Sequence, residues 1–521
     1  MLLKPPQSSL GEVPVNPDKV ILSPDDKHNR SLVENAHPQT WENPDPIGVY
    51  NLVVLGGGTA GLVAAAGAAL LGARVALIER HLMGGDCLNT GCVPSKALIH
   101  AARVIAGVRD APKVGVVLSS DPSINFSKVM ERVRLLRAQI SKADSAQRFS
   151  AMGIDVYFGH ARFTSRKSIE VAGKTLSFAR AVIATGGRPI VPTIPGLEEI
   201  GYLTSETLFC LSKLPKRMAV VGAGSFGCEM AQAFARFGSD VILLELADRI
   251  LPKAPHHVSE LVETALEHDG VTIKKKCDIH SAVRKEGGRA FAISSAGQKE
   301  EIVVDEILLG VGRTPNVEDL GLSEAGVGIN PTKGISVNGF LRTNNRRIYA
   351  AGDVCSPYHY THTAEAQAAI VVQNALFLPS KKAGSLIVPW CTYTDPEVAH
   401  IGLYPEEAES AGIPVRRLRI EISEVDRAIL DGESEGFAEA YLGRRGKILG
   451  ATIVARRAGD LIAEIALAMK SEVGLETIAS TIHPYPTQME AIRKLGLRYR
   501  LGRVTPFIKR LFSLWLRLRR I

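Results

Sequence analysis

Two glycine-rich turns of one pattern predict an α/β fold for this chain of 521 residues. Each turn follows a β-rich apolar run, opens a helical stretch of small residues, and leads to a second apolar run that ends in an acid. This pattern is typical of a Rossmann-like dinucleotide-binding domain, so two copies predict two such domains. The length leaves room for about three domains in all.

Residues 1–47 precede the first turn and are rich in proline and polar residues. We expect an irregular N-terminal extension that is ordered only where it lies on the body of the protein.

The first turn lies in YNLVVLGGGTAGLVAAAGAALLGARVALIE, which contains Gly56, Gly58 and Gly61 and ends in Glu79. The first two glycines permit a tight turn and a close approach of backbone to a pyrophosphate, and the third permits helix–strand packing. The helix N-terminus faces the phosphates, and the acid can hold a ribose hydroxyl pair. A buried glycine turn without a ligand is the weaker alternative.

The motif GGDCLNTGCVPSK sets Cys87 and Cys92 close together. A regular helix would separate their Cα atoms by more than about 7 Å, whereas a disulfide needs about 4.4–6.8 Å. Pairing therefore requires a bent segment, which Asn89, Thr90 and Gly91 tolerate. From the spacing alone, two unpaired thiols remain an equally good interpretation.

The second turn lies in RMAVVGAGSFGCEMAQAFARFGSDVILLE, with Gly222, Gly224 and Gly227 before Glu245. The acid follows the first glycine by 23 residues in both copies. Two sites imply two cofactors, or one cofactor and one dinucleotide substrate. A dithiol close behind the first site suggests that electrons pass among all three.

Composition narrows the class of protein. The net charge of +8 comes from the C-terminal end, because residues 491–521 carry ten Lys and Arg and no acid, which leaves 8 − 10 = −2 for the rest. The basicity does not predict nucleic-acid binding. The other five cysteines are dispersed singly, which predicts a reducing, cytoplasmic compartment. We expect neither a secretory signal nor a spanning helix.

Taken together, the motifs resemble those of the flavoprotein disulfide reductases, which include dihydrolipoamide dehydrogenase, glutathione reductase and mercuric reductase. The resemblance covers about residues 48–495 and rests on both turns, GGDCLNTGCVPSK, ATGGRP, GVGRTPN, IYAAGDV and TYTDPEVAHIG, in chain order. It implies FAD at the first turn, NAD(P)H at the second, and a redox-active Cys87–Cys92 disulfide beside the flavin. It also implies a C-terminal α+β domain that forms a homodimer and completes the active site.

The resemblance divides the chain into parts. We expect an N-terminal extension (1–47), an FAD-binding domain in two segments (48–190 and 319–385), an NAD(P)H-binding domain (191–318), a dimerisation domain (386–496) and a basic amphipathic tail (497–521).

The same resemblance implies roles for individual residues. Cys92 would be the thiol that faces the flavin, and Cys87 the interchange thiol that meets substrate. Lys96 and Glu229 would form an ion pair near the flavin, whose positive partner favours a thiolate. The expected FAD contacts are Gly56, Gly58, Gly61, Glu79, Gly85, Thr185, Gly186, Asp353 and Ala364, the last of these in a helix that points its N-terminus at the flavin. The expected NAD(P)H contacts are Gly222, Gly224, Gly227, Glu245 and Gly312.

The stretch IHPYPTQMEAIRK departs from the reductases of thiol substrates. Aligned on Glu490, it places Tyr485 where those enzymes carry a catalytic histidine, and His483 lies two residues earlier. A tyrosine, with a pKa near 10, is a poor proton shuttle at neutral pH. Tyr485 and AQAFARFGS resemble mercuric reductases, and soft Hg(II) prefers sulfur ligands. No cysteine follows Cys391, however, so the outer thiol pair of those enzymes is missing.

Three functions stay open. The first is electron transfer from NAD(P)H through FAD and Cys87–Cys92 to Hg(II) or a related soft electrophile, with the two thiols as transient ligands and no permanent metal. The second is a slow, dihydrolipoamide dehydrogenase-like activity, and the third is flavin binding or metal sequestration with vestigial turnover. Glu245 predicts NADH over NADPH, because an acid repels the 2′-phosphate, while Arg249 is the competing indication.

The C-terminal sequence TPFIKRLFSLWLRLRRI has apolar residues at helical spacing and Lys and Arg on the remaining face. Two interpretations are equally open: a helix packed on the dimer partner, and a peripheral membrane contact through residues 505–521.

Overall fold

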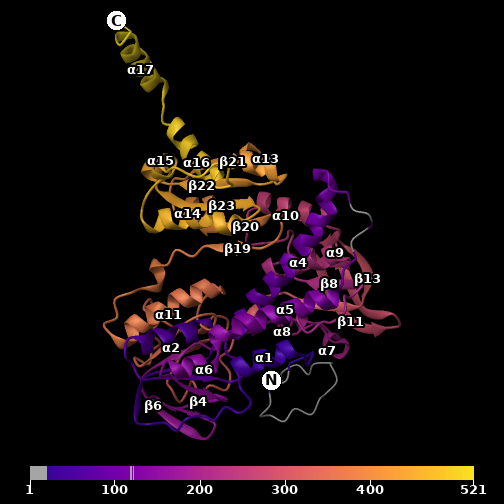
Figure 1. The fold of residues 1–521 in the computed structure, drawn as a ribbon, viewed down its shortest axis with the longest axis vertical. Coiled ribbons are helices and arrows are strands. Elements are labelled where there is room, and N and C mark those ends of the chain that lie inside the picture. Colours follow the sequence, from indigo (N-terminus) through magenta and orange to yellow (C-terminus); the bar gives the residue numbers. More distant parts are fainter. Residues whose placement is uncertain (1–19, 21, 118–119, 121–122, 521) are drawn as a thin grey trace. The chain divides into compact units, whose positions relative to one another are not determined.

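The computed structural model describes residues 20, 22–117, 120 and 123–520, and the chain forms two compact units (Figure 1). The first unit comprises Met1–Pro252 and Leu266–Leu386. The second comprises Lys253–Ala265 and Ile387–Ile521.

The N-terminal extension contains a helix, α1 (Lys27–Ala36), so the prediction of an irregular segment is wrong there. The carboxylate of Asp26 caps the helix by accepting hydrogen bonds from the backbone N–H groups of His28 and Asn29. Leu32 and Val33 are buried on its inner face. The cap and the buried face stabilise a helix where composition alone indicated none. Residues 1–19 and 21 of the predicted extension lie outside the described residues.

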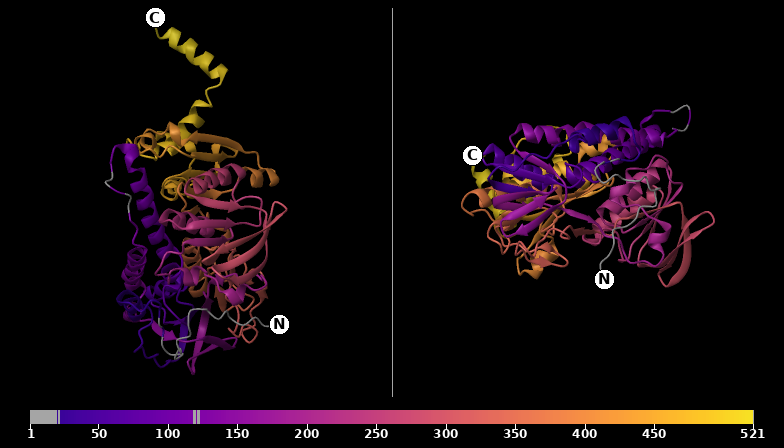
Figure 2. Two further views of the ribbon diagram at one scale, coloured as in Figure 1. Left: turned by 90° about the vertical axis from the view of Figure 1, so that its right-hand side faces the viewer. Right: turned by 90° about the horizontal axis from the view of Figure 1, so that it is seen from below.

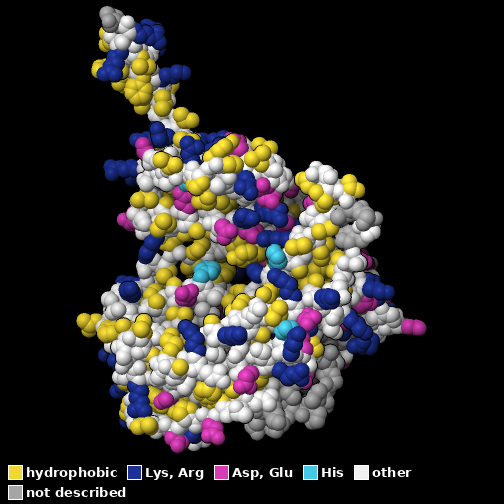
Figure 3. Space-filling view, viewed as in Figure 1, with side chains coloured by type: hydrophobic (Ala, Val, Ile, Leu, Met, Phe, Trp, Pro, Cys, Tyr) yellow, Lys and Arg dark blue, Asp and Glu magenta, His cyan; other side chains and the backbone are white. Residues whose placement is uncertain are grey.

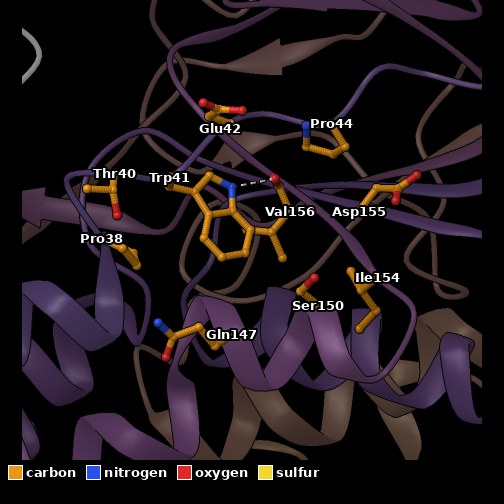
Figure 4. Close-up of a pocket in the computed structure, with 10 residues that line it drawn as sticks. All are labelled: Pro38, Thr40, Trp41, Glu42, Pro44, Gln147, Ser150, Ile154, Asp155 and Val156. Carbon is orange, nitrogen blue, oxygen red and sulfur yellow. Dashed lines mark hydrogen bonds between the residues drawn. The ribbon is translucent and has the colours of Figure 1, made fainter.

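The segment after α1 covers the edge strand β3 (Asp155–Phe158) of the first sheet. Asn43 donates its side-chain N–H to the carbonyl of Phe158 (2.8 Å) and accepts from the Phe158 N–H (2.7 Å). The Trp41 indole donates to the Val156 carbonyl (3.1 Å), and both residues line a small pocket of about 290 Å³ (Figure 4). The extension therefore satisfies backbone groups that an open sheet edge would expose.

The first sheet has seven strands and carries the first glycine turn. Its parallel part runs in the order β3, β2 (Val75–Glu79), β1 (Val49–Leu55) and β6 (Lys174–Ile183). The first half of β6 pairs with the antiparallel β5 (Ser168–Val171), which pairs with β4 (Ala161–Ser165). The second half of β6 pairs with β18 (Ile348–Ala350), which returns from far along the chain.

Small residues bring two helices close together on this sheet. α2 (Thr59–Leu70) packs against α11 (Thr361–Leu376), as Figure 1 shows. Ala64, Ala68 and Ala368 lie in their shared core and are completely buried. The alanine-rich helical stretch of the sequence thus serves close packing.

The second sheet repeats the parallel arrangement. Its order is β10 (Val271–Lys274), β9 (Asp240–Leu244), β8 (Arg217–Val221) and β14 (Glu306–Leu309). α9 (Ser225–Phe237) follows β8 across the second glycine turn. An antiparallel sheet of β11 (Cys277–Lys285), β12 (Gly288–Ser295) and β13 (Gln298–Val304) adjoins it, in pink in Figure 2.

Glycine is required at equivalent places in both turns. Gly56 and Gly222 have φ angles of +106° and +97°, in the left-handed region. A Cβ atom on Gly61 would lie 1.7 Å from the Gly56 oxygen, and one on Gly227 would lie 1.9 Å from the Gly222 oxygen. The two fingerprints therefore fold alike.

The second unit has the α+β character predicted for the C-terminal domain, and it also includes Lys253–Ala265 from the middle of the chain. Its antiparallel sheet has the order β19 (Trp390–Thr392), β20 (Glu397–Gly402), β23 (Ile448–Ala455), β22 (Phe437–Leu442) and β21 (Arg416–Glu421). The helices α14 (Ala458–Lys470), α15 (Leu475–Ser480) and α16 (Glu490–Leu501) share its apolar core. α17 (Pro506–Leu518) follows. The predicted fold class is confirmed.

Candidate active site

A cavity of about 750 Å³ in the first unit brings the first glycine turn and the two-cysteine motif together. Both cysteines line it, with eight of the nine residues predicted to contact FAD: Gly56, Gly58, Glu79, Gly85, Thr185, Gly186, Asp353 and Ala364. The ninth, Gly61, is buried beneath the turn.

The cavity is shaped for a ligand that approaches backbone closely. The Gly84 N–H donates to the Gly57 carbonyl (2.8 Å), which holds the cysteine motif against the turn. A Cβ on Gly85 would lie 2.6 Å from the Gly58 Cα, so only glycine allows this contact. At Gly186, by contrast, a Cβ would meet nothing within 4 Å and would project into open space. The residues present fit an adenine dinucleotide such as FAD.

Glu79 is held at the end of β2 by two backbone donors. Its carboxylate accepts from the N–H of Gly57 (2.6 Å) and the N–H of His81 (2.8 Å). Burial raises the pKa of this carboxyl, against the effect of the two hydrogen bonds. The side chain thus presents an oriented acceptor to the cavity.

Glu245 repeats this geometry in the second sheet. Its carboxylate accepts from the N–H of Ala223 (2.6 Å) and the N–H of Ala247 (2.9 Å), at the same offsets from glycine and acid as in the first copy. Gly312, with φ +123°, lies just beyond β14 and accepts a hydrogen bond from the Ile190 N–H. The Arg249 guanidinium contacts the carboxylate of Asp248 (3.3 Å).

The two cysteines lie on either side of a helix break. Cys87 is in α3 (Gly85–Asn89), and Cys92 is the first residue of α4 (Cys92–Asp110). Thr90 and Gly91 between them have non-helical backbone angles, and a Cβ on Gly91 would lie 2.9 Å from the Asp86 carbonyl oxygen. The break brings the thiols within hydrogen-bonding distance of each other, which a regular helix would not do.

The two thiols have opposite acidities. The hydrogen bond from Cys87 lowers the pKa of Cys92, and the Thr361 hydroxyl (3.3 Å) and the Lys96 charge lower it further. The same thiol–thiol hydrogen bond, together with burial, raises the pKa of Cys87. In the dithiol, the negative charge therefore sits on Cys92 and the proton on Cys87.

Lys96 and Glu229 form the predicted ion pair, at 2.7 Å. Lys96 lies one turn after Cys92 on α4, so the two side chains share a helix face. Glu229 is on α9, which packs against α4, and only 4% of its side chain is exposed. The pair links the cysteine motif to the second dinucleotide-binding fold.

Sequence reasoning missed a charge network in the cavity. The Arg313 guanidinium contacts the carboxylates of Asp86 and, at 3.4 Å, Asp353, and all three residues line the cavity. Burial raises the pKa of Asp353, and the Arg313 charge opposes the rise. Asp86 and Arg313 lie within quoted motifs, GGDC and GVGR, but nothing in either motif links one to the other.

In the second unit, Tyr485 is 73% exposed and its hydroxyl donates to the Asp426 carboxylate (2.9 Å). This hydrogen bond raises the pKa of Tyr485. The Glu490 carboxylate accepts from the Asp426 backbone N–H (3.3 Å), and its charge also raises the pKa of Tyr485. Asp426 is therefore a site residue that sequence reasoning missed.

His483 has two neighbours of its own. One ring nitrogen lies 2.9 Å from the Glu464 carboxylate, and the other lies 3.0 Å from the Thr481 carbonyl. Both ring nitrogens of His483 are therefore engaged with groups other than Tyr485 and Asp426.

Comparison with known proteins places this site in context. Residues 50–369 match the model for pyridine nucleotide-disulphide oxidoreductases, and residues 388–495 match the model for their dimerisation domain. A mercuric reductase from Lysinibacillus sphaericus is 34% identical over 86% of this chain and 82% of its own length. A dihydrolipoyl dehydrogenase from Thermus scotoductus is also 34% identical, over 85% of this chain and 96% of its own.

Solved structures agree with these matches. A HOCl-induced flavoprotein disulfide reductase from Escherichia coli superposes with a TM-score of 0.77 at 26% identity, over 86% of this chain and 99% of that chain. LpdA from Mycobacterium tuberculosis gives a TM-score of 0.78 at 26% identity, over 87% of this chain and all of that chain.

Proposed function

The chain belongs to the pyridine nucleotide-disulphide oxidoreductase family, and we propose that it reduces Hg(II) or a related soft electrophile with electrons from NADH. Enzymes of this family depend on FAD and NAD(P)H. The observation that carries the proposal is the pair of thiols of opposite acidity in the wall of a dinucleotide-sized cavity.

FAD, when bound, supplies the hydride and electron chemistry that joins the nicotinamide nucleotide to the disulfide. The glycine turn, Glu79 and the N-terminus of α11 are placed to hold it. Two electrons and one proton convert the Cys87–Cys92 disulfide into a Cys92 thiolate and a Cys87 thiol. The Lys96 charge and the Thr361 hydroxyl favour the thiolate.

The acceptor assignment follows from the chemistry at Tyr485. Reduction of a disulfide substrate needs a group that moves a proton to and from the interchange thiol. Tyr485, with its pKa raised by Asp426, is unsuited to that role, and His483 is engaged elsewhere. Hg(II) can bind the Cys92 thiolate and displace the proton of the Cys87 thiol directly to water, after which its reduction needs two electrons and no proton; its softness favours sulfur. The relatives named mercuric reductase support this choice.

Dihydrolipoyl dehydrogenase-like activity is the second candidate. The relatives with that name are as similar to this chain as the mercuric reductases are. The absence of cysteines beyond Cys391, where mercuric reductases usually carry an outer thiol pair, keeps this candidate in competition.

NADH is the proposed nucleotide. Glu245 presents a carboxylate at the end of β9, where a ribose 2′-phosphate would meet like charge. Arg249 already contacts Asp248, which reduces its value as a phosphate ligand.

The match of residues 388–495 to a dimerisation domain supports a homodimer, and the cysteine pattern supports a cytoplasmic location.

The decisive experiment is an anaerobic titration of the FAD-loaded protein with NADH, followed by stopped-flow reoxidation with Hg(II), lipoamide, oxidised glutathione and quinones. We expect two thiols to appear on reduction, a long-wavelength thiolate–flavin absorbance, and fastest reoxidation by Hg(II). Cys92→Ser should abolish the absorbance, and Cys87→Ser should keep it. Lipoamide as the fastest acceptor would establish the second candidate, and no appearance of thiols would refute a dithiol relay.

A further inference from the structure

The last helix of the chain, α17, buries none of its side chains. Seven large apolar residues on it are each more than half exposed: Phe507, Leu511, Phe512, Leu514, Trp515, Leu516 and Leu518. Figure 3 shows apolar side chains in yellow and basic ones in dark blue along this helix. Exposed apolar surface of this extent usually marks an interaction site.

The local sequence, and not packing, sets where α17 begins. The Thr505 side chain accepts a hydrogen bond from the Ile508 N–H (3.3 Å), and Pro506 occupies the first helical position. At the other end, the Arg519 guanidinium lies 5.5 Å from the centre of the Trp515 ring. The helix thus carries its own start signal and an internal contact near its end.

The two kinds of side chain occupy separate faces. At about 100° per residue, the apolar side chains cover roughly 200° of the helix circumference. Lys509, Arg510, Ser513 and Arg517 fall together on the opposite side, with Arg520 just beyond the helix end. The basic residues therefore flank both margins of a wide apolar face, as in helices that lie in a membrane interface.

Length and charge indicate the occupant of this face. A helix of 13 residues is about 20 Å long, less than the bilayer core of about 30 Å. None of the described helices has the length and apolar character needed to cross a bilayer. Residues 491–521 contain ten Lys and Arg and no acid, whereas the remaining chain has a net charge of only −2. The acids of a second copy are nearly balanced by its own Lys and Arg, so its body offers little net opposite charge, whereas an anionic lipid surface presents a high density of negative charge.

We propose that α17 docks the enzyme on the surface of an anionic lipid bilayer. The apolar face enters the headgroup boundary, and the Lys and Arg side chains contact lipid phosphates. Docking through α17 does not depend on which acceptor the dithiol reduces.

Flotation of the full-length, FAD-loaded protein with vesicles tests this proposal. One vesicle preparation is phosphatidylcholine alone, and the other adds about one-third phosphatidylglycerol. We expect wild-type protein to float with the anionic vesicles at least about tenfold more than with the neutral ones, and to lose that preference in high salt.

Three double variants separate the contributions of the apolar face and of the basic side chains to vesicle binding. Leu511→Asp/Trp515→Asp should abolish flotation with both vesicles, and Arg510→Gln/Arg517→Gln should lose the anionic preference. The matched control, Leu70→Asp/Leu71→Asp, adds two acids at exposed apolar residues near the end of α2 and should float like wild type. NADH oxidation in solution should be unchanged in all three.

Two outcomes would overturn the proposal. One is wild-type protein that floats with neither vesicle, or with both equally. The other is a change of oligomeric state in Leu511→Asp/Trp515→Asp by size-exclusion chromatography with light scattering, which would show that a second copy covers the face.

Discussion

Cys92 and Cys87 are chemically identical side chains that their neighbours make different. Cys92 accepts a hydrogen bond from Cys87, lies 3.3 Å from the Thr361 hydroxyl, and is one helical turn from the Lys96 cation. Cys87 donates this hydrogen bond, keeps its proton, and is partly buried. The difference in acidity between the two thiols therefore comes from the groups around them and not from their order in the motif.

Lys96→Met should shift the titration of Cys92 in the reduced enzyme. The Lys96 charge lowers the pKa of Cys92, so removing it raises that pKa, and the thiolate forms only at higher pH. The midpoint of thiolate absorbance against pH measures the shift. Lys96→Arg keeps the charge and should titrate close to wild type, and an unchanged midpoint in Lys96→Met would contradict the assignment.

Glu245→Ala should change nucleotide preference. Loss of the carboxylate removes a ribose-hydroxyl acceptor and a repulsion toward a 2′-phosphate, so kcat/KM should fall for NADH and rise for NADPH. We expect the ratio to move by about tenfold or more, or about 1.4 kcal/mol. Steady-state rates with both nucleotides provide the measurement. A wild-type enzyme that prefers NADPH would refute the assignment.

Tyr485→His should raise lipoamide reduction. A well-placed histidine contributes about 10²–10⁴-fold to proton transfer, and Asp426, which now accepts from the Tyr485 hydroxyl, can orient an imidazole there. Turnover with Hg(II) should fall, while reduction of the flavin by NADH should not change. Adding Asp426→Asn should cancel the gain, and Tyr485→Phe separates loss of the hydroxyl from gain of the imidazole. If the wild-type protein reduces lipoamide as fast as NADH reduces its flavin, then a group other than residue 485 moves the proton.

At the scale of elements, the N-terminal segment stabilises the cofactor fold. Its helix is tied to α5 (Phe126–Ser141) by the Asp26–Arg134 ion pair at 2.6 Å. Its extended part pairs with β3 through Asn43, and its residues Leu22 and Ser23 line the cofactor cavity. The segment therefore closes both the sheet edge and one side of the cavity.

Asn43→Ala should destabilise the first unit and weaken FAD retention. It leaves the N–H and C=O of Phe158 without their side-chain partner, at a cost of about 1–3 kcal/mol. Thermal unfolding and the release of flavin fluorescence measure the two effects. Glu42→Ala, one residue earlier and exposed, is the matched control and should behave as wild type. Equal unfolding temperatures for the two variants would contradict this role.

At the scale of the whole molecule, the family resemblance implies an active site that spans two subunits, and a mixing experiment tests this expectation. Cys87→Ser and Tyr485→Phe should each lower turnover with Hg(II). In a mixed dimer, the Tyr485→Phe subunit supplies an intact Cys87 and the Cys87→Ser subunit supplies an intact Tyr485. One of the two sites in that dimer is therefore complete. Random mixing should then restore roughly a quarter of wild-type turnover. No recovery would place both residues in one subunit's site, provided that mixed dimers are detected by differential tags.

Sequence alone was sufficient for the two glycine turns and for the acids that end their second strands. These features depend on local periodicity and turn chemistry, which neighbouring residues encode. The break at Thr90–Gly91 was expected only if the two thiols pair, and the α+β character of the second unit was expected only from the family resemblance. The Lys96–Glu229 pair joins residues 133 positions apart, and a family resemblance was needed to predict it.

Only the tertiary structure decided the contacts of Arg313, Asp426 and Asn43. Arg313 meets Asp86 across 227 positions because β15 (Arg313–Pro315) pairs with β7 (Gly187–Pro189) at the cavity wall. Asp426 meets Tyr485, and Asn43 meets β3, through the same kind of long-range packing. Such partners depend on how sheets and helices assemble around a common core, and no local pattern specifies which distant side chain that assembly will bring into reach.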